Sequence, residues 1–250
     1  GGVYVVIGGA GGIGEAWTEY MIRHYQARIV WIGRRPRDAE IQSKLDRLAR
    51  LGPVPLYIEA DATDRWALER AYARIKQEHG QVHGVVHSAL VLRDRSLALM
   101  DEAAFRAVLA AKVDVSVRLA QVFCEDRLDF VLFFSSLLGF ETPAGQSNYA
   151  AGCNFKDAFA HALGLAWPCP VKVMNWGYWG NIGIAATAEY RARMARSGLG
   201  SIEAEEGMAA LEMLLGAPQN QLAFIKTIGS PAAWQDPGSE RLRVSTAELP

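Results

Sequence analysis

Short apolar segments rich in valine, isoleucine and phenylalanine recur along the chain and alternate with longer segments of helical periodicity. The apolar runs lie at 3–8, 28–33, 54–59, 82–87, 130–136, 171–176 and 222–227. Helical periodicity is clearest at 39–51 and 64–79. Near-continuous apolar strands that alternate with helices are typical of a parallel sheet covered on both faces. We therefore predict an α/β protein with a Rossmann-type, doubly wound parallel sheet of about seven strands.

The overall composition narrows the function classes. A chain of 250 residues that is 50% hydrophobic can bury one sizeable core. Its net charge of −1 does not favour nucleic acid or an anionic membrane as a partner, and it has no apolar run long enough to span a membrane. Three cysteines without metal-ligand spacing favour a reducing, cytoplasmic location. We also predict no metal site, because His83 and His87 on one strand would lie about 13 Å apart.

Domain boundaries follow from local composition. We predict a catalytic domain over 1–228, with a glycine-flanked, lid-like insert at about 178–202. Residues 229–250 mix proline, glycine and charge, which predicts a tail or linker. Because the chain begins without methionine, we expect it to be part of a longer protein.

Five glycines lie within residues 8–14, after the first apolar run and before a helix predicted to begin near Ile13. In a doubly wound fold this is the place of a phosphate-binding turn, where amides at a helix N-terminus face the anion. A nucleotide-triphosphate loop would continue with Lys and then Ser or Thr, but Glu15 and Ala16 follow instead. A merely flexible loop is the alternative.

The ends of the next two predicted strands indicate which dinucleotide is bound. An NAD site has a carboxylate about 20 residues after the glycines, whereas this chain has Gly33, Arg34 and Arg35. Paired guanidinium groups suit a 2′-phosphate and favour NADPH, unless the arginines are simply solvated. Asp61 could accept from an adenine amino group or cap the following helix, and Asp64 is better explained as a cap.

A serine, a tyrosine and a lysine could together reduce a carbonyl. Ser136 ends the fifth predicted strand, Tyr149 lies 13 residues later at a helix entry, and Lys112 lies 24 residues earlier. A tyrosine can protonate the alkoxide that hydride transfer leaves, if a cation eases the loss of its proton. The serine hydroxyl can hold the carbonyl oxygen. Taken singly, each residue also has a structural explanation: a cap, a core aromatic and a solvated lysine.

These motifs resemble the catalytic ketoreductase domain of modular polyketide synthases, in the short-chain dehydrogenase/reductase superfamily. The similar segments are "GGAGGIG", "GRR", "DAT", "HSA", Lys112, "FSS", "GQSNYAAG" and "NWGYWG", in order over about residues 3–227. "SNYAAGCNFKDAFA" is most similar to synthases whose acyltransferase acts in trans. The resemblance implies that Lys112, Ser136 and Tyr149 are catalytic. It implies cofactor contacts from Gly8, Gly9, Ala10, Gly11, Gly12, Ile13, Gly14, Gly33, Arg34, Arg35, Asp61, Ala62, His87, Ser88, Ala89, Asn175, Trp176 and Gly177.

Three positions depart from the family pattern. Ile7 stands where the family usually has threonine, Leu90 where it has glycine, and Cys153 where many members have a catalytic asparagine. Asn154 is one residue further on, about 100° around a helix, so we do not expect it to substitute. Cys153 is better explained as a small packed residue than as a nucleophile.

The resemblance also bears on product stereochemistry. It implies roles in substrate binding and stereocontrol for Asp94, Leu137 and Asn148. The tryptophan that marks the opposite stereochemical class would fall at Glu141 and is absent. We therefore expect the D-hydroxy (B-type) product.

The resulting hypothesis is NADPH-dependent reduction of a β-ketoacyl chain on an acyl carrier protein. The expected partners are that carrier, a structural ketoreductase subdomain and other synthase domains, without nucleic acid or membrane. The alternatives are a stand-alone short-chain reductase acting on a free ketone and a catalytically silent scaffold domain.

Overall fold

The computed structural model describes residues 1–140, 144–182 and 188–228. It contains one sheet with the strand order β3-β2-β1-β4-β5-β6-β7, in which every pairing is parallel. The strands are β1 (Val3–Ile7), β2 (Arg28–Gly33), β3 (Leu56–Glu59), β4 (Gly84–His87), β5 (Phe130–Ser136), β6 (Val171–Trp176) and β7 (Gln221–Phe224).

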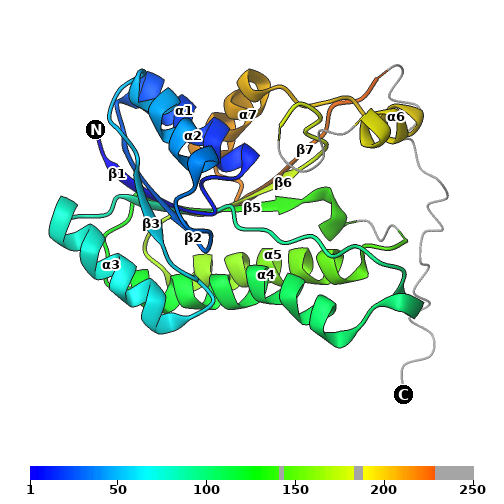
Figure 1. The fold of residues 1–250 in the computed structure, drawn as a ribbon, viewed down its shortest axis with the longest axis horizontal. Coiled ribbons are helices and arrows are strands. Elements are labelled where there is room, and N and C mark those ends of the chain that lie inside the picture. Colours follow the sequence, from blue (N-terminus) through cyan, green and yellow to red (C-terminus); the bar gives the residue numbers. More distant parts are fainter. Residues whose placement is uncertain (141–143, 183–187, 229–250) are drawn as a thin grey trace.

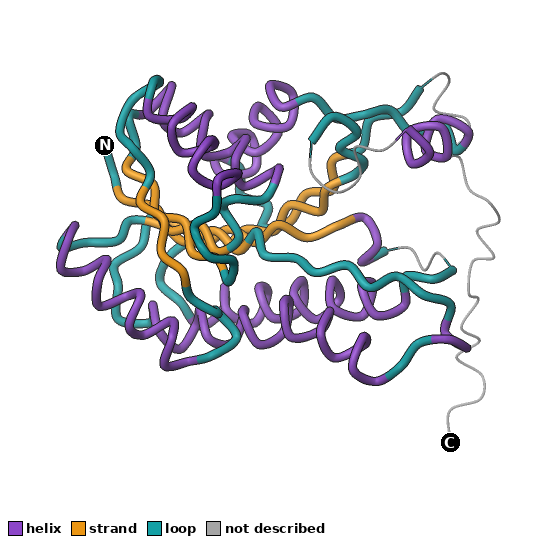
Figure 2. The backbone as a smooth tube through the Cα atoms, in the orientation of Figure 1, coloured by secondary structure: helices purple, strands orange, loops and turns teal. Residues whose placement is uncertain are grey.

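Helices cover both faces of this sheet (Figure 1; Figure 2). One face carries α1 (Gly12–Tyr25), α2 (Ala39–Ala49) and α7 (Ala204–Gly216), whereas the other carries α3 (Arg65–His79), α4 (Glu102–Phe123) and α5 (Ser147–Ala166). Two short 3-10 helices, η1 (Leu97–Leu99) and η2 (Leu137–Gly139), and α6 (Ala188–Arg196) complete the described elements.

Each face of the sheet has its own apolar core. Val30 and Val85 pack with Leu119 of α4 on one face, whereas Trp31 packs with Trp17 of α1 on the other. Adjacent strand residues point to opposite faces, so a strand covered on both sides must be apolar at every position. This explains the unbroken apolar runs in the sequence.

Short polar side chains fix the starts of several helices. Asp64 accepts a hydrogen bond from the Ala67 amide at 3.0 Å, so its predicted capping role is confirmed. Asp38 caps α2 in the same way through the Ile41 amide at 2.9 Å. Such caps satisfy amide groups that a helix leaves free at its first turn.

The prediction of a seven-stranded, doubly wound parallel sheet is confirmed. The division into a domain over 1–228, a lid and a tail stays a prediction: α6 falls in the proposed lid, but 183–187, Glu141 and the tail at 229–250 lie outside the described residues. Within the described ranges, no helix is long and apolar enough to cross a membrane, and no cluster of three His, Cys, Asp or Glu could hold a metal ion.

Candidate active site

A cavity of about 710 Å³ opens at the carboxyl ends of the strands. Its walls include residues that follow five strand ends, namely Gly8, Arg34, Asp61, Ser88 and Gly177. Gly8 and Ser88 follow β1 and β4, the adjacent strands at which the sheet order reverses direction. Doubly wound sheets bind their ligands at such a reversal, so we take this cavity as the candidate active site.

The glycine-rich segment forms the turn that joins β1 to α1, and it tolerates no larger residues at several points. Gly8 has a φ of +85°, and a Cβ there would lie 2.7 Å from the backbone nitrogen of Ala89. A Cβ on Gly9 would lie 2.1 Å from Cδ1 of Trp31, and one on Gly14 would lie 2.9 Å from Cα of Gly9. Gly9 and Gly14 therefore allow close packing of the turn, although neither lines the cavity.

The start of α1 presents free hydrogen-bond donors at this turn. Within the described part of the chain, no protein acceptor bonds the amides of Gly12, Ile13 and Gly14. Gly12 and Ile13 line the cavity with Gly11, whereas Ala10 lines an adjoining cavity of about 1040 Å³ beside α1 and α2. Free amides at a helix N-terminus, together with the helix dipole, favour a bound anion such as a pyrophosphate.

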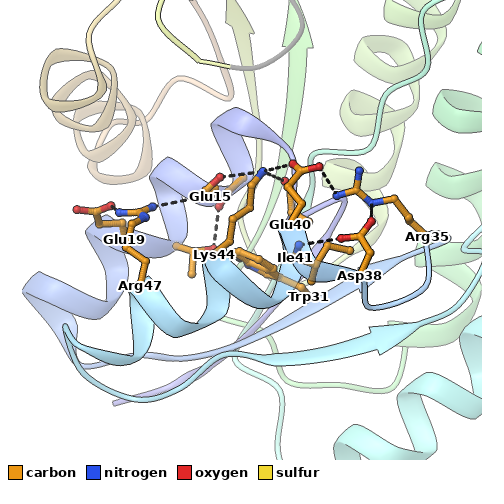
Figure 3. Close-up of polar contacts among 12 residues, drawn as sticks. Glu15, Glu19, Trp31, Arg35, Asp38, Glu40, Ile41, Lys44 and Arg47 are labelled. Atoms are coloured by element: carbon orange, nitrogen blue, oxygen red, sulfur yellow. Dashed lines mark hydrogen bonds and ion pairs between the residues drawn. The ribbon is translucent and has the colours of Figure 1, made fainter.

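Both arginines after β2 line the cavity with exposed side chains, but their surroundings differ. Nε of Arg35 lies 2.9 Å from Oδ2 of Asp38, and one of its terminal nitrogens lies 3.0 Å from Oε2 of Glu40 (Figure 3). Arg34 forms no ion pair with any described residue. Arg34 is thus the less neutralised of the two cations.

The ends of β3 and β4 also contribute residues to the cavity wall. Asp61 lines the cavity with Ala62, while its Oδ1 accepts from the amide and hydroxyl of Thr63 at 2.9 and 2.8 Å. Ser88 and Ala89 line the cavity beyond β4. Asp61 therefore closes a turn and faces the cavity, and it does not cap α3, whose N-cap is Asp64.

The fold brings Lys112, Ser136 and Tyr149 together in the lining of the cavity, from α4, β5 and α5 respectively. Lys112 is 1% exposed, and its Nζ lies 4.1 Å from the centroid of the Tyr149 ring. Ser136 lines the same cavity, and its side chain acts to lower the pKa of Tyr149. A phenol, a hydroxyl and an ammonium group therefore share one wall.

Burial and charge shift the pKa values of Lys112 and Tyr149 in opposite directions. Burial raises the pKa of Tyr149, and the adjacent Lys112 ammonium offsets only part of that rise. Burial alone would lower the pKa of Lys112, but the anionic forms of Tyr149 and Cys153 outweigh it, and the pKa is raised. At neutral pH the phenol is therefore protonated, and the Lys112 ammonium favours the phenolate that forms when Tyr149 gives up its proton.

The end of β6 supports the floor of the cavity. Trp176 and Gly177 line it, and a Cβ on Gly177 would lie 2.8 Å from the carbonyl oxygen of Phe224. The side chain of Asn175 is fully buried away from the cavity lining, where its Nδ2 donates to the carbonyl of Ser136 at 3.0 Å. Asn175 therefore fixes the end of β5 instead of contacting a bound ligand directly.

The segment that precedes α4 is held against the start of α5. Nε2 of Gln146 donates to Asp94 at 2.8 Å, and Nδ2 of Asn148 donates to the carbonyl of Arg93 at 3.1 Å. Oδ1 of Asn148 accepts from the Tyr149 amide at 2.8 Å. Asp94 is exposed and does not line the cavity, whereas its partner Gln146 does. Asp94 and Asn148 thus bear on the site through the backbone beside the tyrosine.

Two other predicted site residues do not line the cavity. The side chain of His87 is fully buried, with Nδ1 3.3 Å from Nζ of Lys156, and Lys156 donates to the carbonyl of Phe134 at 3.0 Å. Both faces of β4 are covered, so a side chain in this strand is enclosed in the core. Leu138, and not the predicted Leu137, lines the cavity after β5.

The helix that carries the tyrosine also shapes the lysine's position. A Cβ on Gly152 would lie 2.6 Å from Cδ of Lys112, so the absent side chain makes room for the lysine. Cys153 is fully buried. Asn154 is exposed and donates to the carbonyl of Ala150 in its own helix at 3.1 Å. Asn154 therefore does not replace the family asparagine.

Sequence reasoning missed several residues of the site. These are Gln146, Leu138 and Ile182 on the cavity wall, Gly152 behind Lys112, and Lys44 beside the glycine turn. Gly152 carries a usable signal, because it lies three residues after the tyrosine and so on a neighbouring face of the helix. Lys44 gives none, because α2 has the pattern of an ordinary solvated amphipathic helix.

Comparison with known families agrees with this geometry. The family described as "KR domain" matches residues 2–181. The chain is 66% identical over 226 residues to polyketide synthase PksN of Bacillus subtilis and 53% identical over 225 residues to polyketide synthase ThaG of Burkholderia thailandensis. Each match covers 90% of this chain and 4% of the relative. The chain therefore spans only a small part of the length of these relatives.

Solved structures with the same fold are also similar. A ketoreductase domain from the bacillaene assembly line has a TM-score of 0.86 at 28% identity, covering 91% of this chain and 56% of the other. An N-terminal ketoreductase from the macrolactin assembly line has a TM-score of 0.83 at 31% identity, covering 90% and 45%.

Proposed function

Because the chain belongs to the ketoreductase (KR) domain family of polyketide synthases, we propose that it reduces the β-carbonyl of an acyl chain held as a thioester on an acyl carrier protein, with NADPH as the reductant. The observation that carries this proposal is the contact between Lys112 and Tyr149, 4.1 Å from Nζ to ring centroid, in the wall of the cavity that the glycine turn also lines.

The chain's own residues would handle the carbonyl oxygen and its proton. Ser136 would donate a hydrogen bond to that oxygen and stabilise the charge that develops on it. Tyr149, protonated at neutral pH, would transfer its phenolic proton to the oxygen. Lys112 would stabilise the phenolate that remains. General acid catalysis of this kind is worth about 10²- to 10⁴-fold in rate.

The residues around the turn fit a dinucleotide. The backbone approach at Gly8 leaves no room for a Cβ, and the cavity-lining amides of Gly12 and Ile13, which bond no described protein acceptor, are available to bind a pyrophosphate. Arg34 would bind the 2′-phosphate that distinguishes NADPH from NADH. The cofactor, when bound, would supply the hydride.

The carrier-bound substrate and the D-hydroxy product follow from the family resemblance. The bonds from Asp94 to Gln146 and from Asn148 to Arg93 support a fixed approach to Tyr149 from that side. The chain's match to 4% of PksN supports a structural subdomain and further synthase domains as partners. We infer a cytoplasmic location on the same basis.

Turnover with NADPH tests the proposal. The wild-type chain should oxidise NADPH with a β-ketoacyl carrier protein, and chiral analysis should show mainly the D-alcohol. Equal turnover of free ketones would favour the stand-alone reductase, whereas NADPH binding without turnover would favour the scaffold. Mainly L-alcohol would refute the stereochemical assignment alone.

A single hydroxyl deletion tests the proton donor. Tyr149→Phe should bind NADPH normally and lose about 10²- to 10⁴-fold in kcat. Tyr72→Phe is a matched control, because Tyr72 lies outside the cavity lining and packs on Phe123 at the C-terminal end of α4, with ring centroids 5.3 Å apart. Undiminished turnover by Tyr149→Phe would remove the basis of the mechanism.

A further inference from the structure

Lys44 of α2 reaches across to the glycine turn. Its Nζ lies 2.8 Å from the carbonyl oxygen of Ala10, 3.1 Å from Oε2 of Glu15 and 3.2 Å from Oε1 of Glu40. Figure 3 shows Lys44 directed from α2 toward Glu15 on α1, with Glu40 beside it. Its side chain is 22% exposed. The ammonium group therefore connects two helices to the backbone of the turn.

This contact fixes the orientation of one peptide group. The carbonyl of Ala10 and the amide of Gly11 belong to the same planar unit and point in opposite directions. Lys44 binds the carbonyl, while the Gly11 amide donates to the carbonyl of Gly8 at 3.0 Å. Rotation of this peptide would bring the carbonyls of Ala10 and Gly8 face to face. The peptide is thus held at both ends.

The turn needs such a restraint because of its composition. Glycines flank Ala10 on both sides, and glycine backbones change conformation at little steric cost. The held peptide leads directly into the free amides of Gly12 and Ile13 at the start of α1. Its orientation therefore determines how those donors are presented.

We propose that Lys44 is a positioning residue that holds the glycine turn ready for the pyrophosphate of a dinucleotide. This inference rests on the proposed function, since it assumes that a dinucleotide binds at the turn. Lys44 would act through the Ala10 carbonyl and not as a cation for the 2′-phosphate. Both NADPH and NADH would therefore depend on it equally, although only NADPH carries a 2′-phosphate.

The helix offers a matched control. Arg47 lies one turn beyond Lys44 in α2 and also pairs with Glu15, at 2.8 Å, and with Glu19. It forms no hydrogen bond with the turn among the described residues. Arg47→Met thus removes a cation and its ion pairs from the same helix while leaving the Ala10 carbonyl bound.

The test is a set of binding titrations, by calorimetry or cofactor fluorescence. Lys44→Met should weaken the binding of NADPH and of NADH by the same factor, about tenfold, which is the size expected for one charge-assisted hydrogen bond. It should leave adenosine 2′-phosphate, which lacks the pyrophosphate, unaffected. Lys44→Arg should restore much of the loss, and Arg47→Met should change none of the three affinities.

Other outcomes would overturn the proposal. If Lys44→Met weakens the binding of NADPH and of adenosine 2′-phosphate but not the binding of NADH, Lys44 is a direct ligand of the 2′-phosphate. A lower melting temperature with unchanged affinities would make it a purely structural ion pair. If Lys44→Met does not fold, Lys44→Gln replaces it, and unchanged dinucleotide affinities would again refute the inference. Wild-type protein that binds neither dinucleotide would refute the proposed function, and this inference with it.

Discussion

Replacement of Gly152 by alanine tests whether the lysine must lie against the tyrosine. The new Cβ would lie 2.6 Å from Cδ and 3.3 Å from Cβ of Lys112, whose side chain is enclosed between α4 and α5. Contacts this short force the lysine to move, and overpacking of this kind costs about 1–3 kcal/mol. Alanine in a helix interior is more favourable than glycine by about 1 kcal/mol of unfolding free energy, which offsets part of this cost. The net loss in unfolding free energy should therefore be about 0–2 kcal/mol.

Catalysis should suffer more than stability. Displacement of the ammonium removes part of the support for the Tyr149 phenolate, so kcat should fall by about tenfold or more with little change in NADPH affinity. The ammonium holds the pKa of Tyr149 lower than burial alone would. In Gly152→Ala this pKa rises further, so the loss of reduction rate at high pH should begin at a higher pH.

The matched control is Gly164→Ala in the same helix. A Cβ there would lie 3.5 Å from Cβ of Val171, which is an ordinary contact. The unfolding free energy of this variant should therefore rise by about 1 kcal/mol, and its activity should be unchanged. Urea unfolding and the pH profile of NADPH oxidation measure both effects. If Gly152→Ala and Gly164→Ala have the same stability, the same kcat and the same pH profile, the reasoning is refuted.

Three further outcomes are expected. Arg34→Ala should raise the Kd of NADPH by about tenfold and leave the Kd of NADH unchanged. Arg35→Ala should raise the Kd of NADPH less, because two carboxylates already neutralise Arg35. Parallel titrations of the two variants with both dinucleotides check these outcomes. Gly8→Ala should lose dinucleotide binding and lower the melting temperature, because the residue combines a φ of +85° with a 2.7 Å approach to Ala89. Burial lowers the pKa of His87 well below 6.5, so unfolded chains take up a proton that the folded core excludes. Unfolding free energy should therefore fall as the pH drops below 6.5, and His87→Leu should flatten this part of the urea-unfolding profile.

The site was largely predictable where each residue's role follows from its place next to a strand end. The turn after β1, the arginines after β2 and the serine at the end of β5 all line the cavity, because a parallel sheet brings its carboxyl ends to one edge. The sequence was less reliable in predicting which side chains inside a strand, or one residue past its end, face the cavity. His87 is enclosed in the core, and Leu138 lines the cavity in place of Leu137.

The amino-acid sequence alone determined the class of fold and the chemistry available to it. Apolar runs of strand length can be buried only in a sheet covered on both faces, and the order of the motifs along the chain assigns each to a strand end. Only the tertiary structure decided which side chains meet. Lys112 reaches Tyr149 because two helices pack closely over Gly152, and Lys44 reaches the turn because α2 lies beside α1. These contacts depend on the packing distance between elements, which no local pattern records, because a helix shows the same periodicity whatever its neighbour.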